Sequence, residues 1–224
     1  MVAQEISLVL ASIEEESVFR VIEQARSLLG SDVEIIVVDK SSDAYEERLR
    51  KAGVRVIRQH GSGVVNALIE GFNSASGSIL ASTDADGTHD PSGLREGVEL
   101  VRSGNADMVL GNRLGNLTKG SMPMQIRMGN AALSWLFRIL YHTRTRDALT
   151  GLFVMRRDAF DLIKDIEPYR GGTEFFAMEL AKRGKRLEDV QIRYYGRAHG
   201  KSKITKYKFG YGIKLALEMF RRRP

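Results

Sequence analysis

The sequence contains no cysteine, and it has no long apolar run. The absence of cysteine excludes disulfide bonds, thiolate zinc sites and a thiol nucleophile. No apolar stretch reaches the ~18 residues that suggest a membrane-spanning helix. The first twelve residues also lack the basic start and apolar core of a secretory signal. With 43% apolar and 28% charged residues, the chain has the composition of a folded globular domain and not of a disordered one.

Acidic residues are scarce at one end of the chain. Residues 201–224 hold eight Lys or Arg and one acidic residue, a local charge of +7, and the rest of the chain has 26 basic and 27 acidic residues. The net charge of +6 therefore belongs to this last segment. This distribution favours a local contact with an anionic partner over a basic domain that wraps nucleic acid.

Strand and helix signals alternate in the first half of the sequence. Apolar strands are predicted at 6–11, 33–39, 54–58, 78–83 and 107–112, with helical segments between them. Ser12 and Glu15 have the spacing of a capping box, which predicts that a helix begins there and ends near Gly30. Such alternation predicts an α/β fold with a mostly parallel sheet flanked by helices. Ligands of such sheets bind beyond the carboxyl ends of the strands.

The second half is less regular. Helices are predicted at 123–142 and 173–183, strands at 151–157 and 190–195, and a last helix reaches the C-terminus. No repeat or interdomain linker interrupts the sequence.

Two carboxylates follow the fourth predicted strand, in "ILASTDADGTHDPSGL". Asp84 and Asp86 are separated only by Ala85. Mg²⁺ and Mn²⁺ take hard oxygen ligands, often few of them from protein. The pair therefore suits a divalent cation, although Asp-Gly is also a common turn dipeptide.

Two glycine-containing loops could contact a phosphate-bearing ligand. "RAHGKSK" places Arg197 and Lys203 in a cationic loop suited to a diphosphate, and a solvated basic loop is the alternative. "HGSGVVNALIEGF" places glycines just before a helix, where a ligand can approach the backbone. It lacks the Gly-Lys-Ser/Thr ending of a P-loop.

Taken in order, the motifs resemble those of a known family. They are "VVD", "GSG…EGF…ASG", "DADGTH", "GNR", "DALTGLFVMRR" and "RAHGKSK". This series resembles the family-2 glycosyltransferases of the GT-A fold, and within them the dolichyl- or polyprenyl-phosphate sugar synthases, typified by dolichyl-phosphate mannose synthase. The resemblance covers roughly residues 5–205. It implies metal-dependent, inverting transfer of a hexose from a nucleotide-sugar to dolichyl or polyprenyl phosphate.

The same resemblance implies the residues that bind the donor. Asp84 and Asp86 are the nucleotide-sugar and metal carboxylates, with Asp86 the direct and catalytic ligand of Mg²⁺ or Mn²⁺. Glu15 and Asp39 contact the nucleoside. GDP-mannose is the first expected donor, followed by UDP-glucose and UDP-N-acetylglucosamine.

Four basic residues complete the site that the resemblance implies. Arg197 and Lys203 close over the donor diphosphate. Arg113 and Arg127 bind the acceptor phosphate and are counted with Asp86 as catalytic.

The chain departs from the family pattern in three places. The usual Pro-Thr-Tyr-Asn-Glu is Ala-Ser-Ile-Glu-Glu at 11–15, and the usual Asp-Asp is Asp39-Lys40. Both lie where the nucleoside is expected, so they leave the donor base open. The usual Gln-His-Pro-Pro is Thr-His-Asp-Pro at 88–91, near the metal.

Two segments suggest a membrane surface. The helix at 123–142 has a narrow polar stripe and a wide apolar face, which fits either an interfacial or a core helix. The last segment interleaves Lys and Arg with aromatic residues, as membrane-surface helices do. We therefore expect a glycosyltransferase domain at 1–204, a basic helix at 205–224, and a cytoplasmic protein held peripherally at the inner face of the cell membrane. Nucleic-acid binding through the last segment ranks lower.

The kind of acceptor determines whether the reaction needs a general base. A phosphate monoester has its second pKa near ~6, so it is a nucleophile at neutral pH without a general base. A sugar or protein-linked hydroxyl would need a base, and Glu174, Asp90 and Asp147 are the candidates. A nucleotide-binding module without catalysis is the remaining alternative.

Overall fold

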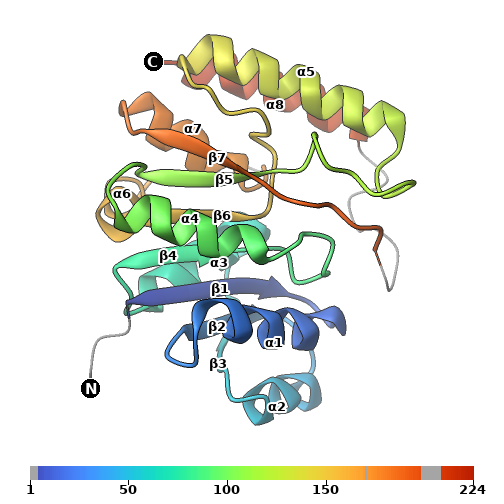
Figure 1. The fold of residues 1–224 in the computed structure, drawn as a ribbon, viewed down its shortest axis with the longest axis vertical. Helices are drawn as coiled ribbons and strands as arrows, with labels where there is room; N and C mark the ends of the chain where they lie inside the picture. The colour runs from blue at the N-terminus through green and yellow to red at the C-terminus, as the bar shows by residue number, and fades with distance from the viewer. Residues whose placement is uncertain (1–4, 170, 198–207) are drawn as a thin grey trace.

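A seven-stranded sheet forms the centre of the computed structural model, which describes residues 5–169, 171–197 and 208–224 (Figure 1). The strand order is β3-β2-β1-β4-β6-β5-β7. Neighbouring strands are parallel except for β6, which is antiparallel to both β4 and β5. The strands are β1 (Ile6–Ser12), β2 (Glu34–Asp39), β3 (Arg55–Arg58), β4 (Ile79–Ser82), β5 (Met108–Asn112), β6 (Phe153–Arg156) and β7 (Leu187–Gln191). The predicted α/β fold with a mostly parallel sheet is confirmed.

Eight helices surround the sheet in the described part of the chain. They are α1 (Ser17–Leu29), α2 (Asp43–Lys51), α3 (Val64–Ser74), α4 (Ser92–Arg102), α5 (Met124–Tyr141), α6 (Arg157–Asp161), α7 (Glu174–Lys182) and α8 (Lys208–Arg222). Apolar residues of α1, α2 and α4 form one core, and those of α3, α5, α6, α7 and α8 form the other.

The continuous apolar strands are explained by these two cores. In β1, Leu8 and Leu10 pack in the first core and Val9 packs in the second. Successive side chains of a strand point to opposite faces, so a strand covered on both faces is apolar at every position. Full burial of one such side chain contributes about 1.5–3 kcal/mol.

The carboxyl ends of the parallel strands lie together at one edge of the sheet, to the right in Figure 1. Asp39 ends β2, and Asp84 follows the last residue of β4 by two positions. The reversed strand β6 begins at this same edge, because Phe153 pairs with Ser82. Gly151 is therefore brought toward Asp84, although the two residues lie 67 positions apart in the sequence.

Two predicted elements differ from the structure. Ser12 does not cap a helix, since it is the last residue of β1 and pairs in register with Asp39 of β2. Helix α1 begins at Ser17 and has no side-chain cap hydrogen bond. The strand predicted at 190–195 runs instead at Leu187–Gln191, and Tyr194 forms only isolated bridges.

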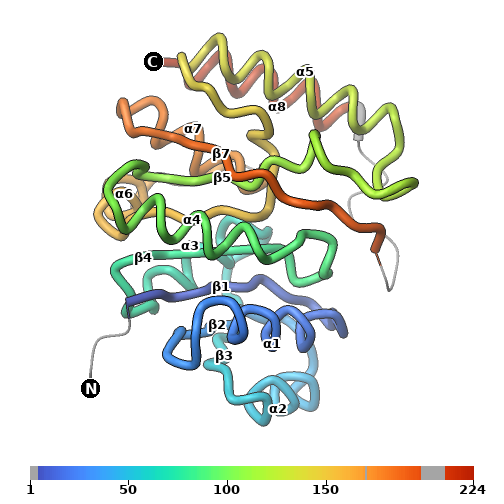
Figure 2. Tube along the Cα trace, viewed as in Figure 1, coloured from blue at the N-terminus to red at the C-terminus, as the bar shows by residue number. Residues whose placement is uncertain are grey.

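Helices α5 and α8 pack against each other beyond β7, and their paths can be followed in Figures 1 and 2. Phe137 and Tyr141 of α5 and Leu215 and Met219 of α8 are buried in one core. The Tyr141 hydroxyl also donates a hydrogen bond to the Met219 carbonyl at 3.2 Å. Each helix thus packs by one face.

The other faces of α5 and α8 carry exposed apolar side chains. These are Met124, Met128, Trp135 and Ile139 on α5, and Ile213, Leu217 and Phe220 on α8. Spacings of three, four and seven place each set along one side of its helix. Among the described helices, none is long and apolar enough to cross a membrane.

Candidate active site

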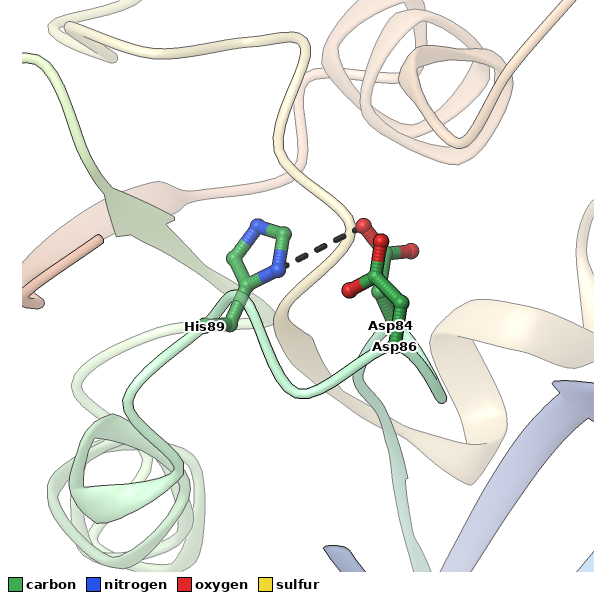
Figure 3. Close-up of side chains that lie close together, drawn as sticks. All are labelled: Asp84, Asp86 and His89. Atoms are coloured by element: carbon green, nitrogen blue, oxygen red, sulfur yellow. Dashed lines mark ion pairs between the residues drawn. The ribbon is translucent and has the colours of Figure 1, made fainter. Parts of the chain in front are cut away.

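Asp84, Asp86 and His89 form a cluster in the loop after β4 (Figure 3). One ligand atom from each lies within 4.8 Å of the others. The His89 side chain is fully buried, and 42% of the Asp84 side chain is exposed. The cluster is thus open to solvent on its carboxylate side.

The two oxygens of Asp86 have different surroundings. Oδ1 accepts hydrogen bonds from the backbone N–H and the hydroxyl of Thr88, at 3.0 and 2.7 Å. Oδ2 lies 3.6 Å from Nη2 of Arg197. One oxygen therefore fixes the side chain, while the other faces the site.

His89 is a neutral group beside a carboxylate. Its Nδ1 lies 3.4 Å from Oδ2 of Asp84 and 3.3 Å from the Thr88 hydroxyl. Burial, together with the positive charge of Arg113, lowers the pKa of His89 to about 3. At neutral pH the imidazole is uncharged and can offer a nitrogen lone pair.

Two opposing effects act on the pKa of Asp84. Desolvation by the surrounding protein raises its pKa, and the nearby charges of Arg113 and Arg197 lower it, with desolvation the larger effect. A bound divalent cation would favour the ionised form in the same way. Two carboxylates and a neutral imidazole at these distances fit Mg²⁺ or Mn²⁺, with further positions left for water and a phosphate oxygen.

Gly151 forms the wall behind Asp84. A Cβ atom at this position would lie 2.2 Å from Oδ1 of Asp84. The backbone of the segment before β6 therefore approaches the carboxylate as closely as only glycine allows.

Arg113 and Asp147 form a buried ion pair next to this cluster. Nε and Nη2 of Arg113 donate to the two Asp147 oxygens at 2.7 and 2.8 Å, and Nη2 also donates to the Leu149 carbonyl at 2.7 Å. Burial alone would lower the pKa of Arg113, but Asp147 holds it above its ordinary value. Burial would likewise raise the pKa of Asp147, but Arg113 lowers it. Both groups are therefore ionised, with most of the guanidinium held by Asp147.

Arg127, the other predicted acceptor residue, lies on the exposed surface of α5. Its Nη2 is 3.5 Å from the Leu114 carbonyl, which places it near the segment that follows β5. The structure thus brings Arg127 toward the neighbourhood of Arg113 and leaves its guanidinium accessible.

Glu15 and Arg197 are joined across 182 positions of sequence. Nη2 of Arg197 donates to Oε2 of Glu15 at 2.7 Å. Arg197 also lies 3.6 Å from Oδ2 of Asp86, so it connects Glu15 to the cluster, and the donor-binding role of both residues stays a prediction. Lys203 lies outside the described residues.

Asp39 is fully buried at the end of β2. Its Oδ1 accepts a hydrogen bond from the Ser41 N–H at 2.6 Å. Its Oδ2 is buried and has no hydrogen-bond partner within the described structure. A buried carboxylate oxygen without a partner is costly, so it is suited to accept a hydrogen bond from a ligand.

The three predicted general-base candidates are each engaged in other contacts. Asp147 is held by Arg113. Oε1 of Glu174 accepts from the hydroxyls of Tyr169 and Tyr211, at 2.8 and 2.6 Å. Asp90 accepts from the Ser92 N–H at 3.0 Å and from the Tyr195 hydroxyl at 3.3 Å.

Sequence reasoning missed two members of this site. His89 belongs to a departure from the family pattern and is not predicted to be a metal ligand, although "DADGTH" places it five residues after Asp84. Gly151 is predicted only to begin a strand. The signal for His89 was local, whereas the contact of Gly151 depends on the direction of β6.

Comparisons with known proteins point to one family. Residues 8–163 match the sequence profile of Glycosyl transferase family 2. The low-salt glycan biosynthesis hexosyltransferase Agl6 of Haloferax volcanii is 30% identical over 219 residues, covering 94% of this chain and 52% of that protein. The chain therefore spans about half the length of this relative.

Two further relatives carry related names. A dolichyl-phosphate hexose transferase of the same organism is 30% identical over 204 residues, covering 89% of this chain and 86% of that protein. A dolichol-phosphate mannosyltransferase of Pyrococcus furiosus is 29% identical over 210 residues, covering 84% and 55%.

The fold also matches a solved structure. Glucosyl-3-phosphoglycerate synthase from Mycobacterium tuberculosis, crystallised with Mn²⁺ and UDP-glucose, superposes with a TM-score of 0.71 at 20% identity. The match covers 98% of this chain and 79% of that one. At this identity the likeness concerns the fold.

Proposed function

Because this chain belongs to glycosyl transferase family 2, we propose that it transfers a hexose from a nucleotide-sugar to a polyprenyl or dolichyl phosphate at a membrane surface. GDP-mannose is the first donor to test, and UDP-glucose and UDP-N-acetylglucosamine follow. The names of the two dolichyl- and dolichol-phosphate relatives support this class of acceptor.

One observation carries the proposal. Asp84, Asp86 and His89 converge at the carboxyl edge of the sheet, beside the guanidinium of Arg197. A divalent cation held by this cluster would offset the charge that develops on the departing diphosphate. The Mn²⁺ in the solved complex with UDP-glucose supports Mn²⁺ or Mg²⁺ as the cofactor.

The other described residues proposed to contact the donor lie near the same carboxyl edge of the sheet. The unpartnered Oδ2 of Asp39 is suited to accept a hydrogen bond from the nucleoside. Glu15 lies within reach of the same region through its contact with Arg197. Arg197 would bind the diphosphate, and Lys203 is assigned to the same loop by the sequence motif.

The contacts of the three candidate general bases favour an acceptor that needs no base. Asp147, Glu174 and Asp90 already accept hydrogen bonds from protein groups. A phosphate acceptor needs none of them, because its dianion attacks directly. The acceptor oxygen would form the new bond to the anomeric carbon as the bond to the diphosphate oxygen breaks, which inverts the configuration. Arg127, with the edge of Arg113, would position the acceptor phosphate.

The exposed apolar faces of α5 and α8 support a peripheral membrane contact. Arg127 and Arg138 on α5 and Lys214 and Arg221 on α8 are exposed beside these apolar side chains. Cations next to an apolar face favour an anionic bilayer surface. We assign residues 1–204 to the catalytic domain and 205–224 to a membrane-surface helix, and we place the protein at the inner, cytoplasmic face, where nucleotide-sugars are found.

A donor panel tests the function. The protein and polyprenyl phosphate are incubated with each labelled nucleotide-sugar, with Mn²⁺, Mg²⁺ or EDTA. We expect label in the organic phase with one donor only, and no label when EDTA is present. Asp86→Asn should reduce the transfer at least 100-fold, since this substitution removes a metal ligand. Arg127→Ala should impair lipid glycosylation and leave donor affinity nearly unchanged.

Other outcomes would replace the proposal. Equal transfer without lipid phosphate would indicate a hydroxyl acceptor. Metal-dependent nucleotide binding without transfer or hydrolysis would indicate a binding module. Salt-sensitive RNA or DNA binding that survives Asp86→Asn would point to a nucleic-acid partner instead.

A further inference from the structure

Arg197 bridges two carboxylates that the donor and its cation would use. Its Nη2 lies 2.7 Å from Oε2 of Glu15 and 3.6 Å from Oδ2 of Asp86. The three side chains are largely withdrawn from solvent, with 23%, 13% and 20% exposed for Arg197, Glu15 and Asp86. Because the group is shielded, this contact is screened less than a surface ion pair.

The oxygen that Arg197 faces is the one a cation would need. Oδ1 of Asp86 already accepts two hydrogen bonds from Thr88. Oδ2 is turned toward Arg197. A positive charge from the chain itself thus partly offsets the negative charge of the carboxylate cluster.

A divalent cation and Arg197 compete for this place. A cation bound to Oδ2 would lie about 2.0–2.2 Å from it, and therefore within about 6 Å of the guanidinium nitrogen. Like charges this close repel strongly where solvent is limited. Arg197 in this position therefore opposes binding of the cation.

We propose that Arg197 holds the place of the cation in the nucleotide-free protein, and that a nucleoside diphosphate releases it. The proposal deepens the function proposed above and rests on it. A diphosphate offers anionic oxygens that a guanidinium binds through two parallel hydrogen bonds. Arg197 therefore exchanges Asp86 for the diphosphate, and the cation takes the freed oxygen. Metal and nucleotide consequently favour each other's binding.

Metal affinity measured without catalysis tests this exchange. The dissociation constant of Mn²⁺ is measured from the EPR signal of free Mn²⁺, without nucleotide and with saturating GDP or UDP. Without nucleotide, Arg197→Met should bind Mn²⁺ on the order of tenfold more tightly than the wild type. With nucleotide, the variant should gain less affinity than the wild type gains, because the diphosphate has lost a ligand.

Arg20 of α1 offers a matched control. Nη2 of Arg20 donates to the Gly87 carbonyl at 3.3 Å, so it contacts the turn that follows Asp86 through the backbone. Arg20→Met removes the same charge and should leave nucleotide-free Mn²⁺ affinity within about twofold, since long-range charge alone is screened. Arg197→Gln, which keeps a polar side chain, should behave as Arg197→Met does.

The outcomes separate this proposal from the function it rests on. Equal nucleotide-free Mn²⁺ affinity in the wild type and both Arg197 variants, with binding still dependent on Asp86, would overturn the exchange and leave the function standing. Tighter binding in Arg20→Met to the same degree would also overturn it. Mn²⁺ binding to none of the proteins, with or without nucleotide, would overturn both.

Discussion

At the scale of single residues, Asp84 can keep its position because Gly151 has no side chain. A Cβ atom there would lie 2.2 Å from Oδ1 and 2.5 Å from Cγ of Asp84. Asp84 would have to turn away, because the clash is at the carboxylate itself. The glycine is thus part of the geometry of the candidate metal site without contributing a ligand atom.

Gly151→Ala should therefore reduce Mn²⁺ affinity and transfer at least tenfold, because ligand displacements near 1 Å are enough to disable a site. Isothermal titration with Mn²⁺ in the presence of nucleotide checks this. Gly129→Ala on α5 is the control, since a Cβ atom there meets nothing within 4 Å. Unchanged affinity in Gly151→Ala would mean that Asp84 is not a ligand.

Residues of the site differ in how far sequence alone could reveal them. Asp84 and Asp86 are neighbours in the chain, so their pairing was readable from "DADG" and a predicted strand. Glu15 and Arg197 lie 182 positions apart. Only the family motif placed both near the donor, and nothing in the sequence indicated that they would pair with each other.

At the scale of elements, α5 and α8 present a common apolar surface. Trp135 and Leu217 are 62% and 63% exposed, on helices that pack together through their opposite faces. The sequence left core and interfacial readings open for the helix at 123–142. The structure shows that α5 has one face of each kind: Phe137 is buried, and the side chain of Trp135 is not.

The single tryptophan of the chain makes this surface testable. Vesicles containing an anionic lipid should shift the Trp135 emission to shorter wavelength, because the indole enters the bilayer interface. Ile213→Ser with Leu217→Ser should weaken vesicle binding roughly 10- to 100-fold, given about 1.5–3 kcal/mol for each large apolar side chain fully buried and less for partial insertion.

Leu162→Ser serves as the control for that experiment. Leu162 is 49% exposed but lies at the end of α6, away from the α5 and α8 surface. The Leu162→Ser variant should bind vesicles as the wild type does. Equal losses in both variants, or no shift in Trp135 emission, would contradict a membrane contact through α5 and α8.

At the scale of the whole molecule, we expect Asp189 on β7 to lower stability at neutral pH. Its Oδ2 accepts from the Arg146 N–H at 2.6 Å, while its Oδ1 is buried with no partner among the described groups. Desolvation, with a smaller contribution from Asp147, raises the pKa of Asp189 to about 6. The fold thus prefers the protonated side chain, so this residue's contribution to stability falls as pH rises from about 4 through about 6.

Asp189→Asn should remove that dependence, since asparagine is never ionised. The variant should exceed the wild type by about 1–2 kcal/mol in free energy of unfolding at pH 7 and by little at pH 4. Urea titrations at several pH values measure the difference. Glu188→Gln, which removes a charge at the adjacent position, should change stability by less than about 0.5 kcal/mol. A constant difference between pH 4 and 7 would exclude this role for Asp189.

Most of the fold could be predicted because the sequence patterns that specify it are local. Alternating strands and helices in the first half specify a parallel sheet, and the motif series indicated family 2, which the profile match confirms. The direction of β6 was not predictable, because a short apolar strand such as "FVMR" packs equally well in either direction. That direction determines which backbone meets Asp84.

The reversed strand also has a consequence for how the protein is made. β4 and β5 are never neighbours, since β6 lies between them and pairs with both. A nascent chain that has left the ribosome only as far as Asn112 thus has a β5 with no place to dock and an Asp84 with no backbone behind it. The edge that carries the candidate metal site is completed only after β6 has emerged and inserted, so this site forms late in the synthesis of the polypeptide.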